Sequence, residues 1–198
     1  IISIGLNYRR HAQEAGMALP REPIVSSKSV HALAGPYDDL ILPPGAEKTD
    51  WEVELGVVIG RRAHYLASPA VAGRHIAGYC TANDVSERSW LLERGGEWLK
   101  GKSFQSFAPL GPYLVPAAQV GDPGNLRLSC TVNGQLMQDD SSADMVFSVP
   151  ELVHYLSHCM VLEPGDVILT GSPGGIAMGR PGQPYLRAGD LVEAEVAG

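Results

Sequence analysis

Apolar residues occur along the chain in short runs separated by glycine and proline, a pattern typical of a fold built from many strands. The clearest run covers residues 50–60, which are rich in apolar and β-branched side chains and end at Gly60. Residues 126–134 alternate between apolar and polar positions and end in Asn-Gly, the dipeptide of tight hairpins. We predict strands over both segments, and further strands over residues 23–29, 76–83, 167–170 and 190–196.

Helical periodicity is confined to short segments. A helix over residues 149–160 is predicted by a capping box, because Glu151 follows Ser148 by three positions. A shorter helix is predicted over residues 8–15, with Asn7 as its N-cap and a glycine as its stop. The core positions of the longer helix are Leu152, Val153, Leu156 and Met160, and weaker helices are predicted over residues 68–74 and 86–92.

Two acidic residues precede the apolar part of the 50–60 strand. Because successive side chains of a strand point to opposite faces, Glu52 and Glu54 share one face. Two carboxylates at the edge of a core repel each other, and a divalent cation such as Mg²⁺ or Ca²⁺ relieves the repulsion. Asp84 follows the 76–83 strand and is either a third oxygen ligand or the N-cap of the next helix. A solvated acidic edge is the alternative interpretation of the Glu52–Glu54 pair.

The predicted 8–15 helix carries a candidate general base. His11 and Glu14 are three residues apart and therefore share a helix face. A carboxylate beside an imidazole fixes its tautomer and raises its basicity, although surface pairs of this kind are also common. Lys28 and Lys102 are candidate cations for an anionic ligand, with a solvated lysine as the alternative for each.

Two glycine-rich segments suggest anion binding to different degrees. Residues 96–103 match the spacing of a P-loop, but no buried strand precedes them, so we predict no nucleotide site. Residues 171–175, with the sequence Gly-Ser-Pro-Gly-Gly, could direct backbone N–H groups toward an anion or simply connect two strands.

Composition limits the classes of protein that fit. The 198 residues, 44% of them hydrophobic, are enough for one domain with a sizeable core. The chain begins inside a strand-like segment, so we expect further residues upstream in the full protein. The net charge of −7 argues against nucleic acid as a partner. No apolar run approaches the roughly 20 residues that cross a bilayer. Three separated cysteines without a CxxC pattern favour reduced thiols and a cytoplasmic location.

Several motifs, in order along nearly the whole chain, resemble the catalytic domain of the fumarylacetoacetate hydrolase family. They are Ile4-Gly5-Leu6-Asn7-Tyr8, the segment 51–60, Gly78-Tyr79, Asn83-Asp84-Val85-Ser86, Gly101-Lys102-Ser103, Val132-Asn133-Gly134 and the segment 162–168. The resemblance implies a single α+β, mostly β domain over residues 1–198, a distorted β-sandwich or β-roll with a few short helices that forms homodimers. It also implies Mg²⁺ or Mn²⁺, with Ca²⁺ as another ion that can occupy the same ligands, on Glu52, Glu54 and Asp84.

The same resemblance assigns roles to other residues. His11 and Glu14 match a general-base pair on a lid helix, and Lys102 matches a lysine that contacts the substrate or intermediate. We expect further substrate contacts from Lys28, Arg88, Gly171 and Ser172. Residues 42–50 and 92–98 resemble members that hydrolyse diketo-deoxy sugar acids. Leu91 stands where the family normally has glutamine and Ser172 where it has threonine, so the substrate is left open.

These residues predict a metal-dependent hydrolase that cleaves a carbon–carbon bond in a small anionic 2-oxo or diketo acid. Oxaloacetate-type decarboxylation and isomerisation of a 2-hydroxy-dienedioate pass through the same enolate and are the alternatives. A non-catalytic relative that binds a metabolite is a further alternative. This alternative is disfavoured because all five residues of the predicted metal site and base pair are present.

Overall fold

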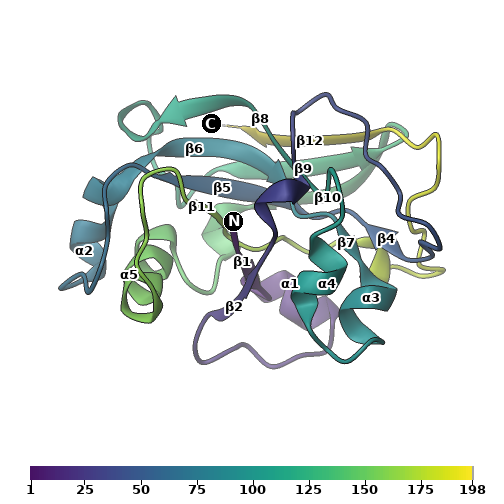
Figure 1. Ribbon diagram of the computed structural model, residues 1–198, viewed down its shortest axis with the longest axis horizontal. Helices are drawn as coiled ribbons and strands as arrows, with labels where there is room; N and C mark the ends of the chain where they lie inside the picture. Colours follow the sequence, from purple (N-terminus) through teal and green to yellow (C-terminus); the bar gives the residue numbers. More distant parts are fainter. Residues whose placement is uncertain (198) are drawn as a thin grey trace.

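The computed structural model describes residues 1–197, and its main element is a mixed seven-stranded sheet with the order β2-β1-β11-β5-β6-β8-β3 (Figure 1). Its strands are β1 (Ile2–Gly5), β2 (Ile24–Ser27), β3 (Leu33–Ala34), β5 (Val53–Ile59), β6 (Ile76–Asn83), β8 (Ala108–Pro116) and β11 (Val167–Leu169). A three-stranded sheet has the order β10-β9-β12 and consists of β9 (Arg127–Val132), β10 (Gln135–Ser141) and β12 (Val192–Ala197). The short β4 (Thr49–Asp50) pairs with β7 (Ser86–Glu87).

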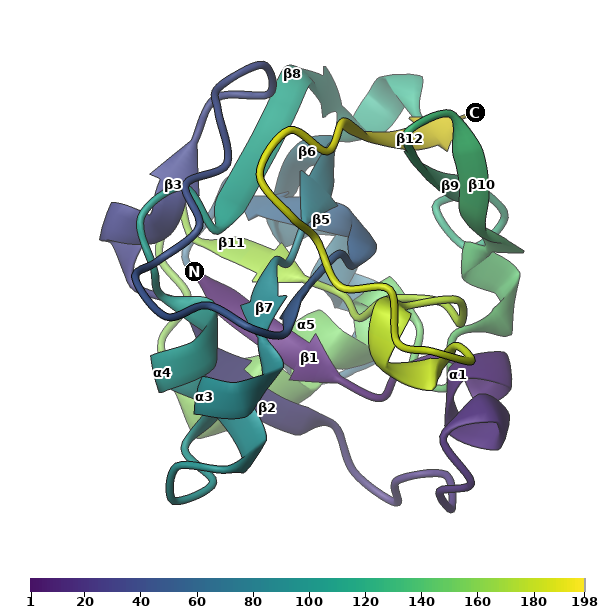
Figure 2. The ribbon, with the colours of Figure 1, turned by 90° about the vertical axis from the view of Figure 1, so that its right-hand side faces the viewer.

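Strand β5 is the centre of the core. Every second residue from Val53 to Ile59 is at most 1% exposed, and β11 and β6 pair with β5 on either side in antiparallel orientation. The three-stranded sheet packs against β5 and β6, and its Leu128 and Cys130 belong to the same apolar cluster. Figure 2 shows these three strands as a separate layer beside the curled main sheet. The predicted α+β, mostly β fold is therefore confirmed.

Short helices cover the edges of the sheets. They are α1 (Arg9–Glu14), α2 (Pro69–Ala72), α3 (Arg88–Leu92), α4 (Trp98–Lys102) and α5 (Val149–Cys159). The predicted capping box between Ser148 and Glu151 begins α5, and Leu152, Val153 and Leu156 of the predicted stripe are buried. Met160 follows the helix as its C-cap and is partly buried. Helix α2 packs against α5 and α3 against α4, as Figure 1 also shows. Among residues 1–197 no helix has both the length and the apolar character that a bilayer crossing requires.

The predicted 50–60 strand is interrupted at Trp51 and Glu52, which lie between β4 and β5. At this break the Glu52 amide donates to the side-chain oxygen of Asn83 at 2.9 Å, and the Asp84 amide donates to the Glu52 carbonyl at 2.9 Å. A side chain thus replaces one rung of the backbone ladder, and the chain bends where the acidic residues lie. Sequence alternation alone could not predict this exchange of partners.

The predicted N-cap of the first helix is wrong. The cap position is Tyr8, without a side-chain hydrogen bond, and the helix begins at Arg9. The side chain of Asn7 instead donates to the carbonyls of Phe147 and Thr170 and accepts from the Phe147 amide. Buried polar groups must find partners, and these distant backbone groups satisfy Asn7 more completely than the helix end would.

The cysteines provide a test of this packing. Cys80 and Cys130 are buried, and burial raises the pKa of these thiols to about 11 and about 12, whereas Cys159 is exposed. Because the thiolate is the reactive form, a chromogenic disulfide reagent should titrate one thiol in the native chain and all three after denaturation. The Cys159→Ser variant is the control and should lose the rapid reaction. Rapid labelling of Cys80 or Cys130 without denaturant would contradict the packing of β6 and β9.

Candidate metal centre

Three carboxylates converge where β5 begins and β6 ends. In the antiparallel pair, Val53 lies opposite Asn83, so the residues just outside the ladder, Glu52 and Asp84, become neighbours. Glu54 is the second residue of β5. One oxygen from each of the three carboxylates lies within 4.8 Å of the others, and all three side chains are buried. The predicted ligand set is therefore brought together by strand pairing.

The three carboxylates differ in how they are compensated. Burial raises the pKa of Glu54 well above its ordinary value, and the neighbouring charges of Asp84 and Glu52 raise it further. Within the described residues Glu54 has no cationic partner, and its carboxylate accepts from the Gly171 amide at 2.7 Å. Burial opposes ionisation of Glu52 as well, but Arg88 and Lys102 hold its pKa below its usual range.

This donor set fits a divalent cation. Carboxylate oxygens are the ligands that Mg²⁺ and Mn²⁺ prefer in proteins. The carboxylate of Glu54, whose hydrogen-bond donor is the Gly171 amide, is the group whose negative charge such a cation would neutralise. The alternative of a solvated acidic edge is wrong for this pair, because Glu52 and Glu54 are 7% and 1% exposed.

Lys102 lies against this cluster from helix α4. Its ammonium nitrogen is 2.5 Å from an oxygen of Asp84 and 3.0 Å from an oxygen of Glu52. Burial opposes the charge of Lys102, but the two carboxylates raise its pKa above the ordinary value. The preceding Gly101 permits this position, since a Cβ there would be 2.6 Å from the Cβ of Leu91 on α3. The two helices therefore approach closely enough to carry the lysine into the site.

Lys28, from the end of β2, holds Asp84 from the other side. Its ammonium donates to an oxygen of Asp84 at 2.6 Å and to the Val85 carbonyl at 2.9 Å. Burial lowers the pKa of Lys28 to about 8, against the opposing effect of Asp84. Asp84 is thus held by two lysines and does not cap α3, whose N-cap is Glu87. A contact between Lys28 and substrate stays a prediction.

Arg88 connects the acidic cluster to a residue that the sequence analysis missed. Its guanidinium donates to Glu52 at 2.7 Å and to the fully buried Asp50 at 2.9 Å. Asp50 also accepts from the amides of Ala177 at 2.7 Å and Met178 at 3.1 Å. The signal for Asp50 was the same alternation that paired Glu52 with Glu54, extended two residues toward the N-terminus.

The glycine-rich loop of residues 171–175 binds carboxylates of the protein itself. The amide of Gly171 donates to Glu54, and the amide of Gly175 donates to Glu14 at 2.8 Å. A Cβ at position 174 would be 2.6 Å from the Glu14 carboxyl carbon, so glycine there lets the Glu14 carboxylate lie against the loop. Of the two interpretations left open for this loop, the anion-binding one applies to carboxylates of the protein itself.

Ser172 in the same loop is held by neighbouring strands. Its hydroxyl donates to the Val53 carbonyl and accepts from the side chain of Gln138. The amide of Gly171 and the hydroxyl of Ser172 are therefore both occupied by protein partners. The substrate contacts predicted for these two residues are not tested by this arrangement and stay predictions.

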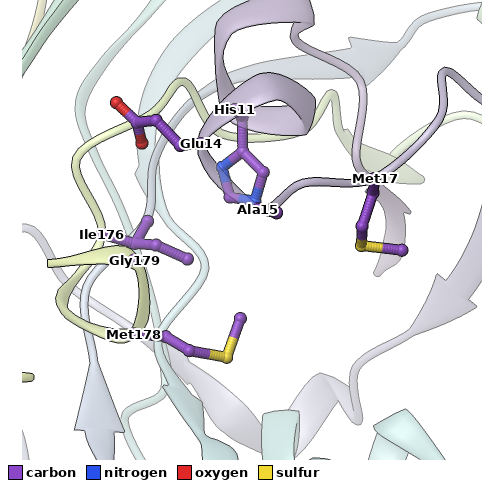
Figure 3. A pocket seen from close by; sticks show the side chains of 7 residues that line it. All are labelled: His11, Glu14, Ala15, Met17, Ile176, Met178 and Gly179. Carbon is purple, nitrogen blue, oxygen red and sulfur yellow. The ribbon is translucent and has the colours of Figure 1, made fainter.

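His11 and Glu14 lie on α1 at the edge of a cavity of about 330 Å³ (Figure 3). The predicted direct contact between them is absent within the described residues, because the Glu14 carboxylate is held by the Gly175 amide. His11 instead has its Nδ1 atom 3.4 Å from the Pro173 carbonyl. Both residues nevertheless line the same cavity.

The comparisons with known proteins agree with this fold. The family model described as "Fumarylacetoacetate (FAA) hydrolase C-terminal" matches residues 1–198. The chain belongs to the fumarylacetoacetate hydrolase family. A protein of Burkholderia multivorans named "Putative hydrolase" is 50% identical over 198 residues, which are 100% of this chain and 70% of the relative.

Two solved structures extend the comparison to the fold. The fumarylacetoacetate hydrolase from Exiguobacterium antarcticum is 32% identical, with a TM-score of 0.92, over 100% of this chain and 71% of that one. The 2-hydroxyhepta-2,4-diene-1,7-dioate isomerase from Mycobacterium marinum is 33% identical, with a TM-score of 0.86, over 100% of this chain and 69% of that one. Hydrolases and isomerases of the fumarylacetoacetate hydrolase family therefore share this architecture.

We expect this fumarylacetoacetate hydrolase family member to bind one divalent cation per chain, and Glu54→Gln to weaken Mn²⁺ binding by at least about tenfold. The variant keeps the shape of the side chain but removes the charge that a cation would neutralise. Calorimetric titration with Mn²⁺ measures the effect. Asp139→Asn, which removes a surface carboxylate paired with Arg127, is the control and should bind Mn²⁺ like the wild type. Unchanged affinity of Glu54→Gln would contradict the ligand assignment.

The same variant should show a pH-dependent gain in stability without metal. The pKa of Glu54 in the folded protein lies above its ordinary value of 4.5. Its favourable contribution to the free energy of unfolding is therefore complete below about pH 4.5 and is lost as the pH rises through the folded-state pKa. The melting temperature of Glu54→Gln, relative to that of the wild type, should therefore increase with pH in a chelating buffer. Saturating Mg²⁺ should reduce the difference, because the cation stabilises only the wild-type site. A difference independent of pH would contradict this account.

Proposed function

We propose that this protein is a metal-dependent hydrolase that cleaves a carbon–carbon bond in a β-dicarbonyl acid of the 2,4-diketo or acylpyruvate type, with Mg²⁺ or Mn²⁺ on Glu52, Glu54 and Asp84. The observation that supports it best is the buried carboxylate cluster, which Arg88 and Asp50 connect to a cavity whose rim carries an imidazole. The charge of His11 lowers the pKa of Glu52. The candidate base therefore lies close enough to the carboxylate cluster to interact with it electrostatically.

The 2-oxo acid end of the substrate would bind on the cationic side of the site. When bound, the divalent cation supplies a Lewis acid that stabilises negative charge on an oxygen. Lys102 holds a full positive charge beside it, because Asp84 and Glu52 keep its pKa high. Its ammonium would offset the charge that develops on the enolate oxygen. Arg88 is held by Asp50 and Glu52 and keeps the carboxylates in place.

His11 would activate the water. A tautomer with the proton on Nδ1, directed at the Pro173 carbonyl, leaves Nε2 free to accept a proton from a water in the cavity. The water oxygen forms a bond to the distal carbonyl carbon, and the bond between that carbon and the central carbon breaks. The electron pair passes to the central carbon and its enolate, which regains a proton from His11. The products are a carboxylic acid and a 2-oxo acid.

Glu14 would support this base from a distance. Its carboxylate, fixed by the Gly175 amide, shares the cavity with His11 and favours the imidazolium that forms when the water is deprotonated. A closer approach of α1 during catalysis would strengthen this effect. Motion of this short helix stays a prediction.

Isomerisation of a 2-hydroxy-dienedioate is the second candidate function. The name of the Mycobacterium marinum relative supports it, at 33% identity over the whole chain. Isomerisation needs only proton transfers between carbon and oxygen atoms, whereas hydrolysis also needs an activated water. The substrate that is turned over, and whether water is incorporated into the product, therefore discriminate between the two functions.

We expect His11→Ala to lower hydrolytic kcat by roughly 10²–10⁴-fold, the usual contribution of a general base. Glu14→Gln should slow hydrolysis less, because the imidazole remains. Purified protein with saturating Mg²⁺ would be assayed against acylpyruvates, oxaloacetate and a 2-hydroxy-dienedioate. Mn²⁺ affinity is the control and should be close to wild type in both variants, since neither residue belongs to the carboxylate cluster. Full hydrolytic turnover by His11→Ala would refute the base assignment, and activity on the dienedioate alone would favour the isomerase.

A further inference from the structure

The wall of the cavity opposite His11 is apolar. Met178 and Ile176 face this space from the segment that follows the glycine-rich loop, and Met17 borders it beyond the end of α1 (Figure 3). Among the described residues that line the cavity, His11 and Glu14 are the ionisable ones, and there is no lysine or arginine. The cavity therefore has a polar side near the base and a thioether-rich side away from it.

The arginines near this cavity in sequence are engaged elsewhere. Arg180 donates to the carbonyl of Gly175 at 3.0 Å and to that of Met137 at 2.5 Å. Arg10 points to Asp140, at 3.3 Å. Neither of these two guanidinium groups is therefore available to pair with an anion inside the cavity.

The apolar wall is fixed relative to the carboxylate cluster. The backbone amides of Ala177 and Met178 donate to Asp50, which is paired with Arg88. Arg88 in turn holds Glu52. This chain of contacts connects the backbone of the apolar wall to the carboxylate cluster, so a substrate bound at the cluster could extend its far end toward the wall.

We propose that the cavity takes the distal group of the substrate and selects an apolar one: an acylpyruvate whose acyl group ends in alkyl or aryl carbon, in preference to one that ends in a second carboxylate. This inference rests on the proposed function, which binds the 2-oxo acid end at the carboxylate cluster. The volume of about 330 Å³ is on the order of ten water molecules, enough for a short branched chain or a six-membered ring.

Charge and burial both support this preference. A second carboxylate in the cavity would lose water and lie near the Glu14 carboxylate without a cation to pair with. An alkyl or aryl group would instead displace water from methionine and isoleucine side chains, which is favourable. Methionine also adapts its shape and makes favourable contacts with aromatic rings.

The test uses two acids of equal length, 2,4-dioxooctanoate and 2,4-dioxooctanedioate, which differ only in a terminal methyl or carboxylate. With saturating Mg²⁺, kcat/KM for the methyl-ended acid should exceed that for the carboxylate-ended acid by at least about tenfold. Equal or faster turnover of the dicarboxylate would overturn the inference.

Variants of the wall locate the effect. Met178→Lys should shift the ratio of the two kcat/KM values toward the dicarboxylate by at least about tenfold, because it adds the missing cation. Met178→Leu, of similar volume, is the matched control and should keep the wild-type preference. Met17→Lys, at a position that is 56% exposed, should shift the ratio in the same direction if Met178→Lys does not fold. A ratio that no folded lysine variant changes would overturn the assignment of the cavity.

Failure of this inference can be distinguished from failure of the proposed function. Hydrolysis of the dicarboxylate in preference to the methyl-ended acid contradicts the apolar pocket and leaves carbon–carbon hydrolysis standing. If neither acid is turned over and calorimetry detects no Mn²⁺-dependent binding of oxalate, both the proposed function and this inference are contradicted. Turnover of neither acid with oxalate bound likewise contradicts both, since the centre would then bind the oxo-acid end without cleaving its substrate.

Discussion

The structure around β5 depends on one constraint, which is that three carboxylates are buried with one oxygen of each within 4.8 Å of the others. Uncompensated buried charge costs more than a small domain can tolerate, so each carboxylate needs a partner. Lys28 and Lys102 hold Asp84, while Arg88 holds Glu52. Glu54 is the exception, because a backbone amide is its hydrogen-bond donor. Among the described residues of this cluster, Glu54 is thus the carboxylate whose charge a divalent cation would compensate.

The surrounding segments follow from that requirement. The close contact of α3 and α4, which Gly101 permits, carries Lys102 inward. The 171–175 loop stabilises Glu54 at one end and Glu14 at the other, so it joins the carboxylate cluster to the helix that carries the base candidate. Asp50 makes the equivalent connection to the 176–179 segment. The two sides of the site are therefore positioned by the same buried polar groups.

Local signals predicted the elements whose causes are local. The alternation of β9, the Asn-Gly turn after it and the capping box of α5 all appear in the structure, with Asn133 and Gly134 both at positive φ. The predicted ligand set also converges, because strand pairing follows from the same alternation. What sequence reasoning missed depends on distant partners. Glu14 turns to an amide 161 residues away, and Asp50 acquires its role from Arg88 and a segment that comes 127 residues later.

The carboxylate cluster alone cannot decide which reaction is catalysed. Relatives named as a hydrolase and as an isomerase share this fold at 32% and 33% identity, and an enolate at the same centre serves either reaction. The reaction must therefore be chosen by groups that meet the other end of the substrate, where water is activated or excluded. Under the proposed function those groups are His11 and the apolar wall, whose backbone is connected to the cluster through Asp50. On that proposal the 176–179 segment and α1 would decide specificity and reaction type, while the cluster would supply the charge stabilisation that both reactions require.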